Sequence, residues 1–487
     1  MAIIVAGALC CCNNDMPNSG VPEVYPDDSH EVLPPYNVDA RKNSQATSEW
    51  STWQAYTLDC IEGFVPGAPE PETDRFGGWK TGTDYGATGF FRVQKIGSRW
   101  WMITPEGNLY LSKGVTSFAP GNSDRSKAEL ASRFGTVSEW ARQEISWLKE
   151  TGFNSVGSWS RDSEILRLDD SEKIPYCVIV SPMGALNGAM KSSGEEKDGY
   201  AAAGWEGYPY DFACVFHPDF DRYVEEKISV ISKYRDDPYC IGYFTDNEIP
   251  WKDYALDRCL EEWPATHINH IKAQEWLDAR KGRTGVSLDE ATDDDRKAFI
   301  AYCLDIYLQK VTAALKKYDP NHLYLGCRFN QWKYELVNEE IFKVAGRYMD
   351  VISLNHYQKW EPDETAMRNW EAWSGKPFMV TEYYVKGEDS GLPNATGAGW
   401  NVRTQTERGY FFQNFTRVLV KGGTCVGWHW FKYMDNDPED TSADPSNRDS
   451  NKGMVQWNYN RWIPLVESMD EFNHNVWNLA EFYDSQK

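Results

Sequence analysis

Short apolar runs recur along this chain and alternate with longer segments in which apolar residues repeat at helical spacing. In one long segment, Leu304, Leu308, Val311 and Leu315 follow one another at intervals of four, three and four. This spacing places all four on one face of a helix. The short runs are rich in β-branched and aromatic residues, as buried parallel strands are. The strands expected from these runs span residues 109–115, 152–157, 174–180, 241–245, 323–327, 351–354, 377–380 and 425–430.

The alternation of strands and helices predicts an α/β protein. Helices are expected at 140–149 and 222–234, and a long helical insert at 252–319. Eight strands with helical segments between most of them favour a single (β/α)8 TIM barrel with loop insertions. A hairpin is expected before the barrel, because two apolar runs, 90–96 and 99–103, flank Gly97-Ser98.

The N-terminal segment has a different composition. Residues 1–12 form an apolar run that ends in Cys10, Cys11 and Cys12 and is too short to span a bilayer. It resembles the end of a bacterial lipoprotein signal, although no Lys or Arg precedes it. We expect a secreted or cell-surface (periplasmic) protein, anchored to the membrane through a lipidated cysteine; a cleaved secretory signal is the alternative. Residues 13–45 are predicted to be a flexible tether, and residues 46–487 a single catalytic domain.

Charge and aromatic content narrow the class of ligand. The chain has 73 acidic and 50 basic residues, a net charge of −23, which argues against a nucleic-acid partner and disfavours sulfated polymers. It also contains 22 Trp and 27 Tyr. Flat aromatic faces suit stacking on sugar rings, with a Trp-rich core as the alternative. The eight cysteines after residue 12 lack metal-ligand spacing, so buried thiols are expected and no metal site.

Two predicted strands end in glutamates. Glu248, preceded by Asn247, follows the fourth strand, and Glu382 ends the seventh. The carboxyl ends of barrel strands meet on one face, so these two side chains should face each other. A pair of carboxylates suits glycoside hydrolysis, in which one neutral acid protonates the leaving oxygen and one ionised carboxylate attacks the anomeric carbon. A separation of about 5–5.5 Å would give retention of configuration.

Other polar and aromatic residues follow the same strands and are candidates for substrate contacts. His356 suits either a core hydrogen bond or a substrate contact, and Tyr357 either a hydrogen bond to the nucleophile or a strand cap. Trp428 and Trp430 are expected to face opposite ways, so that only one enters the barrel mouth. The full set of candidates is Asn247, Arg328, Asn355, His356, Tyr357, Trp428, Trp430 and Asp435.

Several stretches resemble glycoside hydrolase clan A and, within it, the family 50 β-agarases. They are GFFRVQKI at 89–96, GYFTDNE at 242–248, Thr381-Glu382, WHWFKYMD at 428–435 and NKGMV at 451–455. The resemblance implies that Glu248 is the acid/base, that Asn247 contacts the sugar 2-hydroxyl and that Glu382 is the nucleophile. It also implies that Tyr357 orients the nucleophile and that a strand-eight Trp forms the floor of a sugar subsite.

The sequence therefore predicts a retaining β-glycosidase that acts on a neutral, galactose-containing polysaccharide or oligosaccharide, agarose being favoured. Two carboxylates and water suffice for this reaction, so no cofactor is expected. The alternatives are another clan A specificity (a β-galactosidase, or a β-mannan or β-glucan hydrolase) or a non-catalytic glycan-binding lipoprotein. Linkage, exo or endo action, disulfide pairing and oligomeric state are left open by the sequence.

Overall fold

The central element of the fold is a parallel sheet of nine strands. The computed structural model describes residues 32–42, 49–194, 200–203, 206–330, 335–357, 359–443 and 448–487. The α/β class is confirmed. In order across the sheet, the strands are β12 (Leu323–Gly326), β11 (Cys240–Thr245), β8 (Tyr176–Val180), β7 (Ser155–Val156), β6 (Ser112–Val115), β18 (Cys425–Trp430), β15 (Phe378–Glu382), β14 (Ile352–Asn355) and β13 (Phe329–Asn330).

The predicted eight-stranded TIM barrel is wrong in that form, because the sheet is a curled nine-stranded one. Its two edge strands, β12 and β13, are consecutive in the chain, separated only by Cys327 and Arg328. Within the described residues, β12 pairs with β11 and β13 with β14, and no ladder joins β12 to β13. The physical reason is the backbone at this point: Gly326 and Arg328 have φ values of +89° and +54°, which a strand cannot accommodate.

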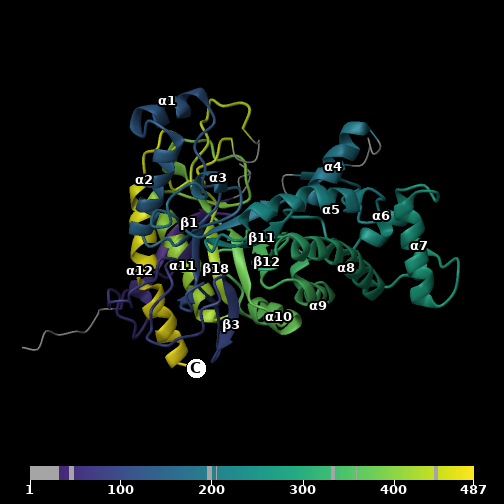
Figure 1. The fold of residues 1–487 in the computed structure, drawn as a ribbon, viewed down its shortest axis with the longest axis horizontal. Coiled ribbons are helices and arrows are strands. Elements are labelled where there is room, and N and C mark those ends of the chain that lie inside the picture. The colour runs from purple at the N-terminus through teal and green to yellow at the C-terminus, as the bar shows by residue number, and fades with distance from the viewer. Residues whose placement is uncertain are drawn as a thin grey trace, which may run out of the picture.

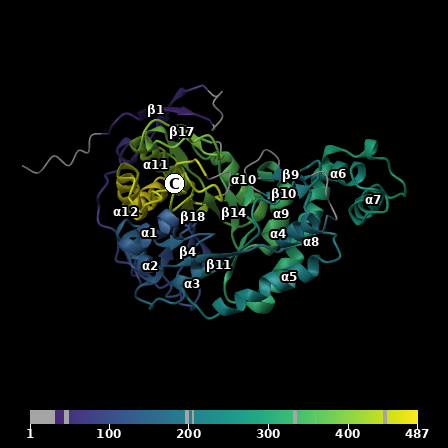
Figure 2. The same cartoon turned by 90° about the horizontal axis from the view of Figure 1, so that it is seen from above.

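Helices surround the outside of the curled sheet (Figures 1 and 2). The predicted helices at 140–149 and 222–234 are confirmed, although the second becomes a 3₁₀-helix from Ser229 to Tyr234. The α-helices are α1 (Asp124–Arg133), α2 (Val137–Glu150), α3 (Asp162–Ile165), α4 (Pro182–Ser193), α5 (Phe220–Ile228), α6 (Ala255–Glu261), α7 (Ile268–Lys281), α8 (Asp293–Tyr318), α9 (Glu339–Tyr348), α10 (Glu364–Ser374), α11 (Gln405–Gly422) and α12 (Ile463–Ser485).

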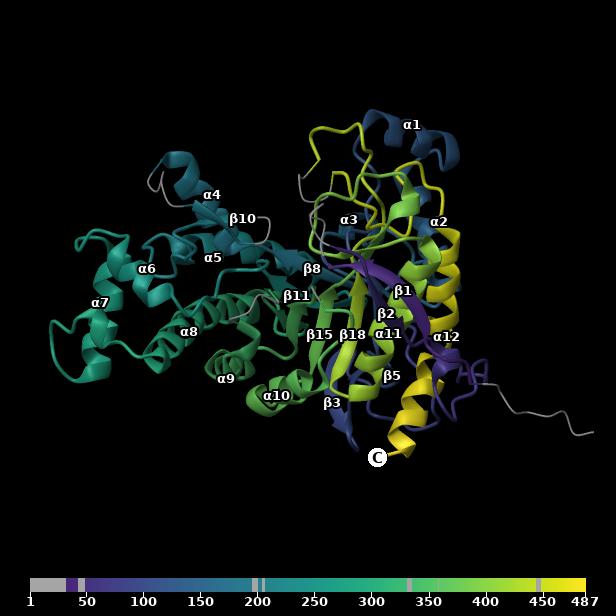
Figure 3. The same ribbon diagram turned by 180° about the vertical axis from the view of Figure 1, so that it is seen from behind.

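The predicted helical insert is also present and forms an arm. Figures 1 and 3 show α6, α7 and the far end of α8 projecting from the main body. By length and composition α8 could cross a membrane, but 61% of its most apolar window is buried inside the protein. It packs against α5, α6 and α9, which is the pattern of a core helix.

Three small sheets complete the fold. The predicted hairpin is confirmed as β3 (Arg92–Ile96) and β4 (Arg99–Ile103), and β5 (Leu109–Tyr110) extends it. β9 (Tyr200–Ala203) pairs with β10 (Glu206–Pro209). A four-stranded sheet contains, in order, β16 (Val385–Gly387), β17 (Trp400–Val402), β1 (Tyr36–Arg41) and β2 (Ser51–Ala55).

Strand β1 lies inside the segment 13–45 that the sequence predicted as a flexible tether, which corrects the prediction for Tyr36–Arg41. Its buried side chains Val38 and Ala40 alternate with more exposed ones, as in a half-buried strand. β1 pairs with β2 and with β17, about 360 residues further along. Cys10, Cys11, Cys12 and the lipid anchor expected there lie outside the described residues.

One buried cation ties the hairpin to the helical layer. Arg99 on β4 is fully buried and pairs through Nε and Nη2 with the Asp484 carboxylate at 2.7 and 2.9 Å. Its Nη1 also donates to the carbonyl of Val420 near the end of α11, at 2.7 Å. Because terminal helix carbonyls lack partners within their own helix, this guanidinium satisfies groups that would otherwise be buried without a hydrogen bond.

Replacement of Arg99 should therefore destabilise the fold. We expect Arg99→Met to lower the free energy of unfolding by about 3 kcal/mol, because the carbonyls of Val420 and Ala480 lose this buried donor and Asp484 loses its two-point ion pair. Urea-induced unfolding followed by tryptophan fluorescence would measure the change. Lys95→Met on the same hairpin removes only the surface pair with Glu371 and should cost less than about 1 kcal/mol. Equal losses in the two variants would contradict this account.

Candidate active site

Strained backbone gathers where the strands of the parallel sheet end. Ser117, Trp159, Glu248 and Arg328 follow β6, β7, β11 and β12, and their φ values are +54°, +64°, +50° and +54°. A left-handed conformation is costly for residues other than glycine, and such strain is concentrated at functional sites. In parallel sheets, ligands bind outside the carboxyl ends of the strands. This end of the sheet is therefore the candidate site.

Glu248 is a buried carboxyl with few partners. Its side chain is next to that of Asn355, whose Nδ2 donates to Oε1 at 2.8 Å, and the residue is 6% exposed. Burial, and after it the charge of nearby Glu382, raises the pKa of Glu248, whereas the Asn355 hydrogen bond and the Arg328 and Lys252 charges lower it; the result is a pKa of about 7. A carboxyl with this pKa can hold a proton at neutral pH and can also release it.

The Asn355 amide is held in one orientation. Thr381 Oγ1 donates to Asn355 Oδ1 at 2.8 Å, which leaves the amide NH2 to donate to Glu248 and to Asn247 Oδ1, the latter at 3.1 Å. Thr381, Asn355, Glu248 and Asn247, which lie at the ends of three strands, thus form one hydrogen-bonded chain. The structure brings Asn247, Glu248 and Asn355 together, as the sequence predicted.

Glu382 has different partners from Glu248. Arg328 Nη2 donates to its Oε1 and the Tyr357 hydroxyl donates to its Oε2. A buried guanidinium and a phenol both stabilise the ionised form of a carboxylate and fix its orientation. The prediction that Tyr357 hydrogen-bonds the second glutamate is borne out by this contact. Glu382 is thus an oriented anion beside a carboxyl that can carry a proton.

Arg328 is the cation at the centre of the site. Its side chain is fully buried, its guanidinium lies 5.5 Å from the ring centroid of Trp159, and its Nη1 has no acceptor among the described residues. Trp159 is half-buried at the end of β7. Trp159 was not among the candidates from the sequence, although a Trp just after the strand-end pair Gly157-Ser158 was a usable signal.

Two aromatic residues that were not candidates from the sequence, Tyr384 and Phe431, form an aromatic wall beside Glu382 together with the predicted Tyr357. The Tyr384 ring lies 5.3 Å from that of Tyr357 and 5.7 Å from that of Phe431. The Lys452 ammonium lies 5.0 Å and 5.5 Å from the centroids of Tyr384 and Phe431. Phe431 is only half-buried, so part of its ring is accessible. We call Tyr357, Tyr384 and Phe431 the aromatic wall.

The His356 side chain packs against the helices that cover the sheet. Its ring packs 5.2 Å from Phe415 of α11 and 6.1 Å from Trp370 of α10, and neither ring nitrogen has a hydrogen-bond partner among the described residues. Burial lowers the pKa of His356 to about 3, which keeps the imidazole neutral. Of the two alternatives for His356, the structure supports a core residue, though without the core hydrogen bond.

Trp428 and Trp430 are both fully buried, so neither offers an accessible ring face to a sugar. Residues two apart in a strand share a face, so the expected opposite facing was wrong in principle. Trp430 packs against Tyr383 and Phe412 at 5.5 and 6.0 Å between centroids. Between them, His429 points the other way and hydrogen-bonds Ser112 Oγ at 2.9 Å. Phe431 supplies the accessible ring at this strand end.

Asp435 is a structural carboxylate. It accepts hydrogen bonds from Asn451 Nδ2, Trp462 Nε1 and the backbone N–H groups of Lys452 and Gly453, at 2.9, 2.8, 2.8 and 2.7 Å. These bonds anchor the loop that carries Lys452 against the end of β18. Asp435 therefore positions Lys452, whose ammonium lies beside the aromatic wall. The Asp435 oxygens already accept hydrogen bonds from other residues of the protein.

Asp246, two residues before Glu248, is likewise structural. It accepts hydrogen bonds from the backbone N–H groups of Met183 and Gly184, in the first turn of α4, at 3.1 and 2.8 Å. The Tyr307 hydroxyl of α8 donates to Asp246 at 2.7 Å. A carboxylate at a helix N-terminus is favourable, so this residue fixes the end of β11 to two helices. Among the described residues, no group of three or more His, Cys, Asp or Glu side chains could hold a metal ion.

Comparison with known proteins places the chain near agarases. No family model matches it. It is 25% identical to β-agarase B of Vibrio sp. (strain JT0107) over 493 residues, which cover 84% of this chain and 50% of that protein. Identity to β-agarase A of the same strain is 24% over 387 residues, covering 71% of this chain and 36% of that protein. The chain thus spans about half the length of the first relative.

Solved structures that are similar to this chain also include agarases. The crystal structure of BpGH50 is 28% identical in sequence with a TM-score of 0.79, covering 95% of this chain and 98% of that one. The agarase AgWH50C has 23% identity and a TM-score of 0.67, covering 84% of this chain and 67% of that one. The structure of an exo-β-agarase has 21% identity and a TM-score of 0.68, and the match covers 85% of this chain and 68% of that one. The last two show likeness of fold alone, and together the comparisons support the resemblance to family 50 β-agarases.

The raised pKa of Glu248 can be measured directly. In protein labelled with ¹³C at the glutamate carboxyl, we expect one resonance to titrate near pH 7, the value at which Glu248 releases its proton. Glu382→Gln should lower this pKa, because it removes the neighbouring negative charge. Glu481→Gln, at an exposed position of α12, is the control and should leave it unchanged. A pKa that rises or stays constant in Glu382→Gln would contradict the assigned coupling.

Proposed function

We propose that this protein is a retaining β-glycosidase that hydrolyses a neutral agarose-like polysaccharide or its oligosaccharides. The observation that carries the proposal is the unequal pair of glutamates. Glu382 is hydrogen-bonded by Arg328 and Tyr357, whereas the Glu248 carboxyl receives, within the described part of the chain, one hydrogen bond from the Asn355 amide and has a pKa of about 7. A carboxyl group with a raised pKa beside a second carboxyl group held by a guanidinium and a phenol is the arrangement that glycoside hydrolysis needs.

In the first step, the Glu382 carboxylate attacks the anomeric carbon while Glu248 gives its proton to the leaving glycosidic oxygen. The C–O bond to the leaving sugar breaks, and an ester bond forms between Glu382 and the remaining sugar. Arg328 and Tyr357 hold the nucleophile in one orientation before attack, which reduces the entropy lost in reaching the transition state.

In the second step, the roles of Glu248 change. Now deprotonated, it takes a proton from water as that water attacks the anomeric carbon and releases Glu382. The net configuration is retained. While Glu382 is ionised, its charge raises the pKa of Glu248. Formation of the ester removes that charge, so the pKa of Glu248 falls. Glu248 therefore stays ionised and can act as the base.

Three observations support the proposed substrate class: the net charge, the accessible aromatic rings and the similarity to agarases. The net charge of −23 disfavours heavily sulfated glycans. Trp159, half-buried, and Phe431 on the aromatic wall offer ring faces to sugars near the two glutamates. The buried Nη1 of Arg328 has an unused donor among the described contacts, which a substrate hydroxyl would satisfy. The relatives named as β-agarases then favour an agarose-like chain over other neutral glycans.

The proposed place of action is outside the cytoplasm, at the cell surface or in the surrounding medium. A polysaccharide must be cut before its units can cross a membrane, and the resemblance of residues 1–12 to a lipoprotein signal agrees with attachment through a lipidated cysteine.

A product assay on a panel of neutral and sulfated polysaccharides tests the function. We expect oligosaccharides to be released from agarose and little from sulfated polymers, with the first-formed sugar in the β configuration by ¹H NMR. Glu382→Gln should reduce turnover by several orders of magnitude with an unchanged circular dichroism spectrum, because the nucleophile is lost. Release of the α anomer first would show an inverting reaction, and a fully active Glu382→Gln would overturn the site.

The pH dependence of kcat/KM follows from Glu248. Protonated Glu248 is the acid of the first step, so kcat/KM should fall about tenfold per pH unit well above pH 7. Lys252→Met should move this fall to higher pH, because the Lys252 charge lowers the pKa of Glu248. Lys227→Met removes a lysine that forms a surface ion pair with Glu226 and should leave the profile in place. A shift to lower pH in Lys252→Met would contradict the sign of this effect.

A further inference from the structure

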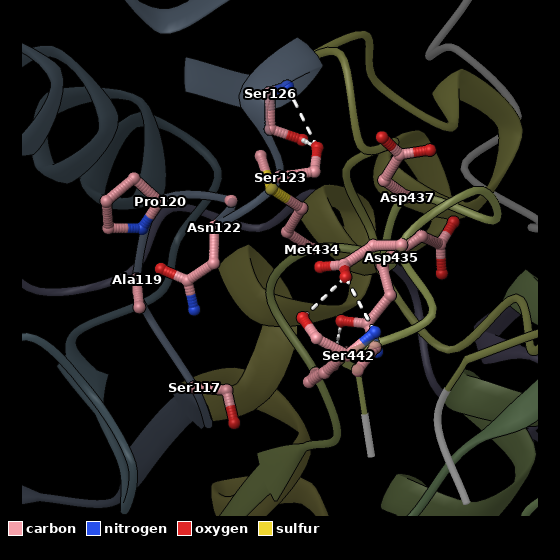
Figure 4. Close-up of a pocket in the computed structure, with 15 residues that line it drawn as sticks. Ser117, Ala119, Pro120, Asn122, Ser123, Ser126, Met434, Asp435, Asp437 and Ser442 are labelled. Atoms are coloured by element: carbon pink, nitrogen blue, oxygen red, sulfur yellow. Dashed lines mark hydrogen bonds between the residues drawn. The ribbon is translucent and has the colours of Figure 1, made fainter. Parts of the chain in front are cut away.

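A cavity lies at the same end of the sheet as the two glutamates. It has a volume of about 350 Å³. The loop between β6 and α1 lines one side, with Ala119, Pro120 and Asn122, and the loop after β18 lines the facing side, with Asp435 and Ser442 (Figure 4). Neither Glu248 nor Glu382 lines the cavity, and of its lining residues only Asp435 was a candidate for substrate contact from the sequence.

The lining combines hydrogen-bonding groups with a small apolar surface. Asn122, Asn436 and Ser442 offer amides and a hydroxyl, whereas Pro120 and Met434 offer apolar surface. Sugars need both kinds of contact, since their hydroxyl groups are polar and one ring face is made of C–H groups. A site with a few convergent polar groups on an otherwise apolar surface is typical of small-molecule recognition.

The charges in the cavity favour a neutral ligand. Asp437 is ion-paired with Arg125, and hydrogen bonds from this guanidinium lower the pKa of Asp437 to about 2, so it is ionised. Asp440 accepts hydrogen bonds from Ser442 N and Oγ at 2.9 and 2.6 Å. Lys432 Nζ donates to Asn436 Oδ1 at 2.7 Å. Because carboxylates face the cavity, a sulfate ester would be repelled there.

Direct contacts connect the cavity to the aromatic wall. Lys432, which lines the cavity, follows Phe431, the last ring of the wall. Asp435, another lining residue, accepts a hydrogen bond from the backbone of Lys452, whose ammonium lies over Phe431. The wall in turn reaches Glu382 through Tyr357. A glycan bound at the glutamates would therefore extend along the wall into this cavity.

We propose that the cavity is a subsite for one further neutral sugar unit of the same glycan chain, beyond the unit that reacts at Glu382. The proposal rests on the proposed function. It makes the loops 116–123 and 431–443 determinants of chain-length preference and of discrimination against sulfated units, while the glutamates carry out the chemistry.

Filling the cavity tests the proposal. Ala119→Trp places a large ring at a half-buried lining position, and Ala131→Trp, the same substitution at an exposed position of α1, is the matched control. kcat/KM would be measured on neutral agarose oligosaccharides of increasing length. The unmodified protein should show a rise of about 10- to 100-fold at the one step of this series at which a sugar unit first reaches the cavity. Ala119→Trp should abolish that rise, and Ala131→Trp should keep it.

A second variant and a binding measurement make the outcome decisive. Asn122→Leu, at an exposed position on the cavity wall, should reduce the rise about 3- to 10-fold, as loss of one or two hydrogen bonds does. Titration calorimetry of Glu382→Gln with the long oligosaccharide should show the same loss of affinity when Ala119→Trp is added. The same oligosaccharide carrying sulfate should bind Glu382→Gln at least tenfold more weakly.

The outcomes separate the two proposals. If the unmodified protein cleaves the oligosaccharides but Ala119→Trp and Asn122→Leu keep the rise, the subsite is wrong and the proposed function stands. An equal loss at every length would place the effect at the glutamates and would also overturn the subsite. If the unmodified protein cleaves none of the glycans, the proposed function fails and the subsite fails with it.

Discussion

The site depends on the burial of two carboxyl groups so close together that their charges interact. Two buried like charges are costly, and the structure resolves this by giving them unequal partners. Glu382 receives a guanidinium and a phenol, and Glu248 receives an amide that Thr381 holds in place. The raised pKa of Glu248, about 7, makes it the carboxyl of the pair that can carry a proton near neutral pH. The remaining elements at this end of the sheet either support this asymmetry or shape the space around it.

The support comes from two other carboxylates, Asp246 and Asp435, whose oxygens accept hydrogen bonds from the protein itself. Asp246 fixes the end of β11 to the first turn of α4 and to α8, so the strained backbone at Glu248 is held from two sides. Asp435 does the same for the loop that carries Lys452. In sequence, Asp246, Glu248 and Asp435 look equivalent, as acidic residues after strands. Only their partners distinguish the reacting group from the anchors.

The sequence was sufficient where a local pattern decides the structure. The hairpin at Gly97-Ser98, the strands and the place of both glutamates follow from alternation and turn residues. It failed where distant residues decide. β1 is ordered because β17, hundreds of residues away, pairs with it. His356 lies in the core because Phe415 and Trp370 cover it. The accessible ring at the end of β18 is Phe431, since its two tryptophans share a buried face.

The failed barrel prediction and the site have one cause. If residues 323–330 formed one regular strand, the side chain of Arg328 would take its place in the alternation of side chains between the two faces of the sheet. Instead, the left-handed backbone at Gly326 and Arg328 divides this stretch into β12 and β13, which pair with different neighbours at opposite edges of the sheet. At this break the Arg328 side chain is buried against Glu382, beneath Trp159. The irregularity is thus the feature that delivers a buried cation to one carboxylate and withholds it from the other.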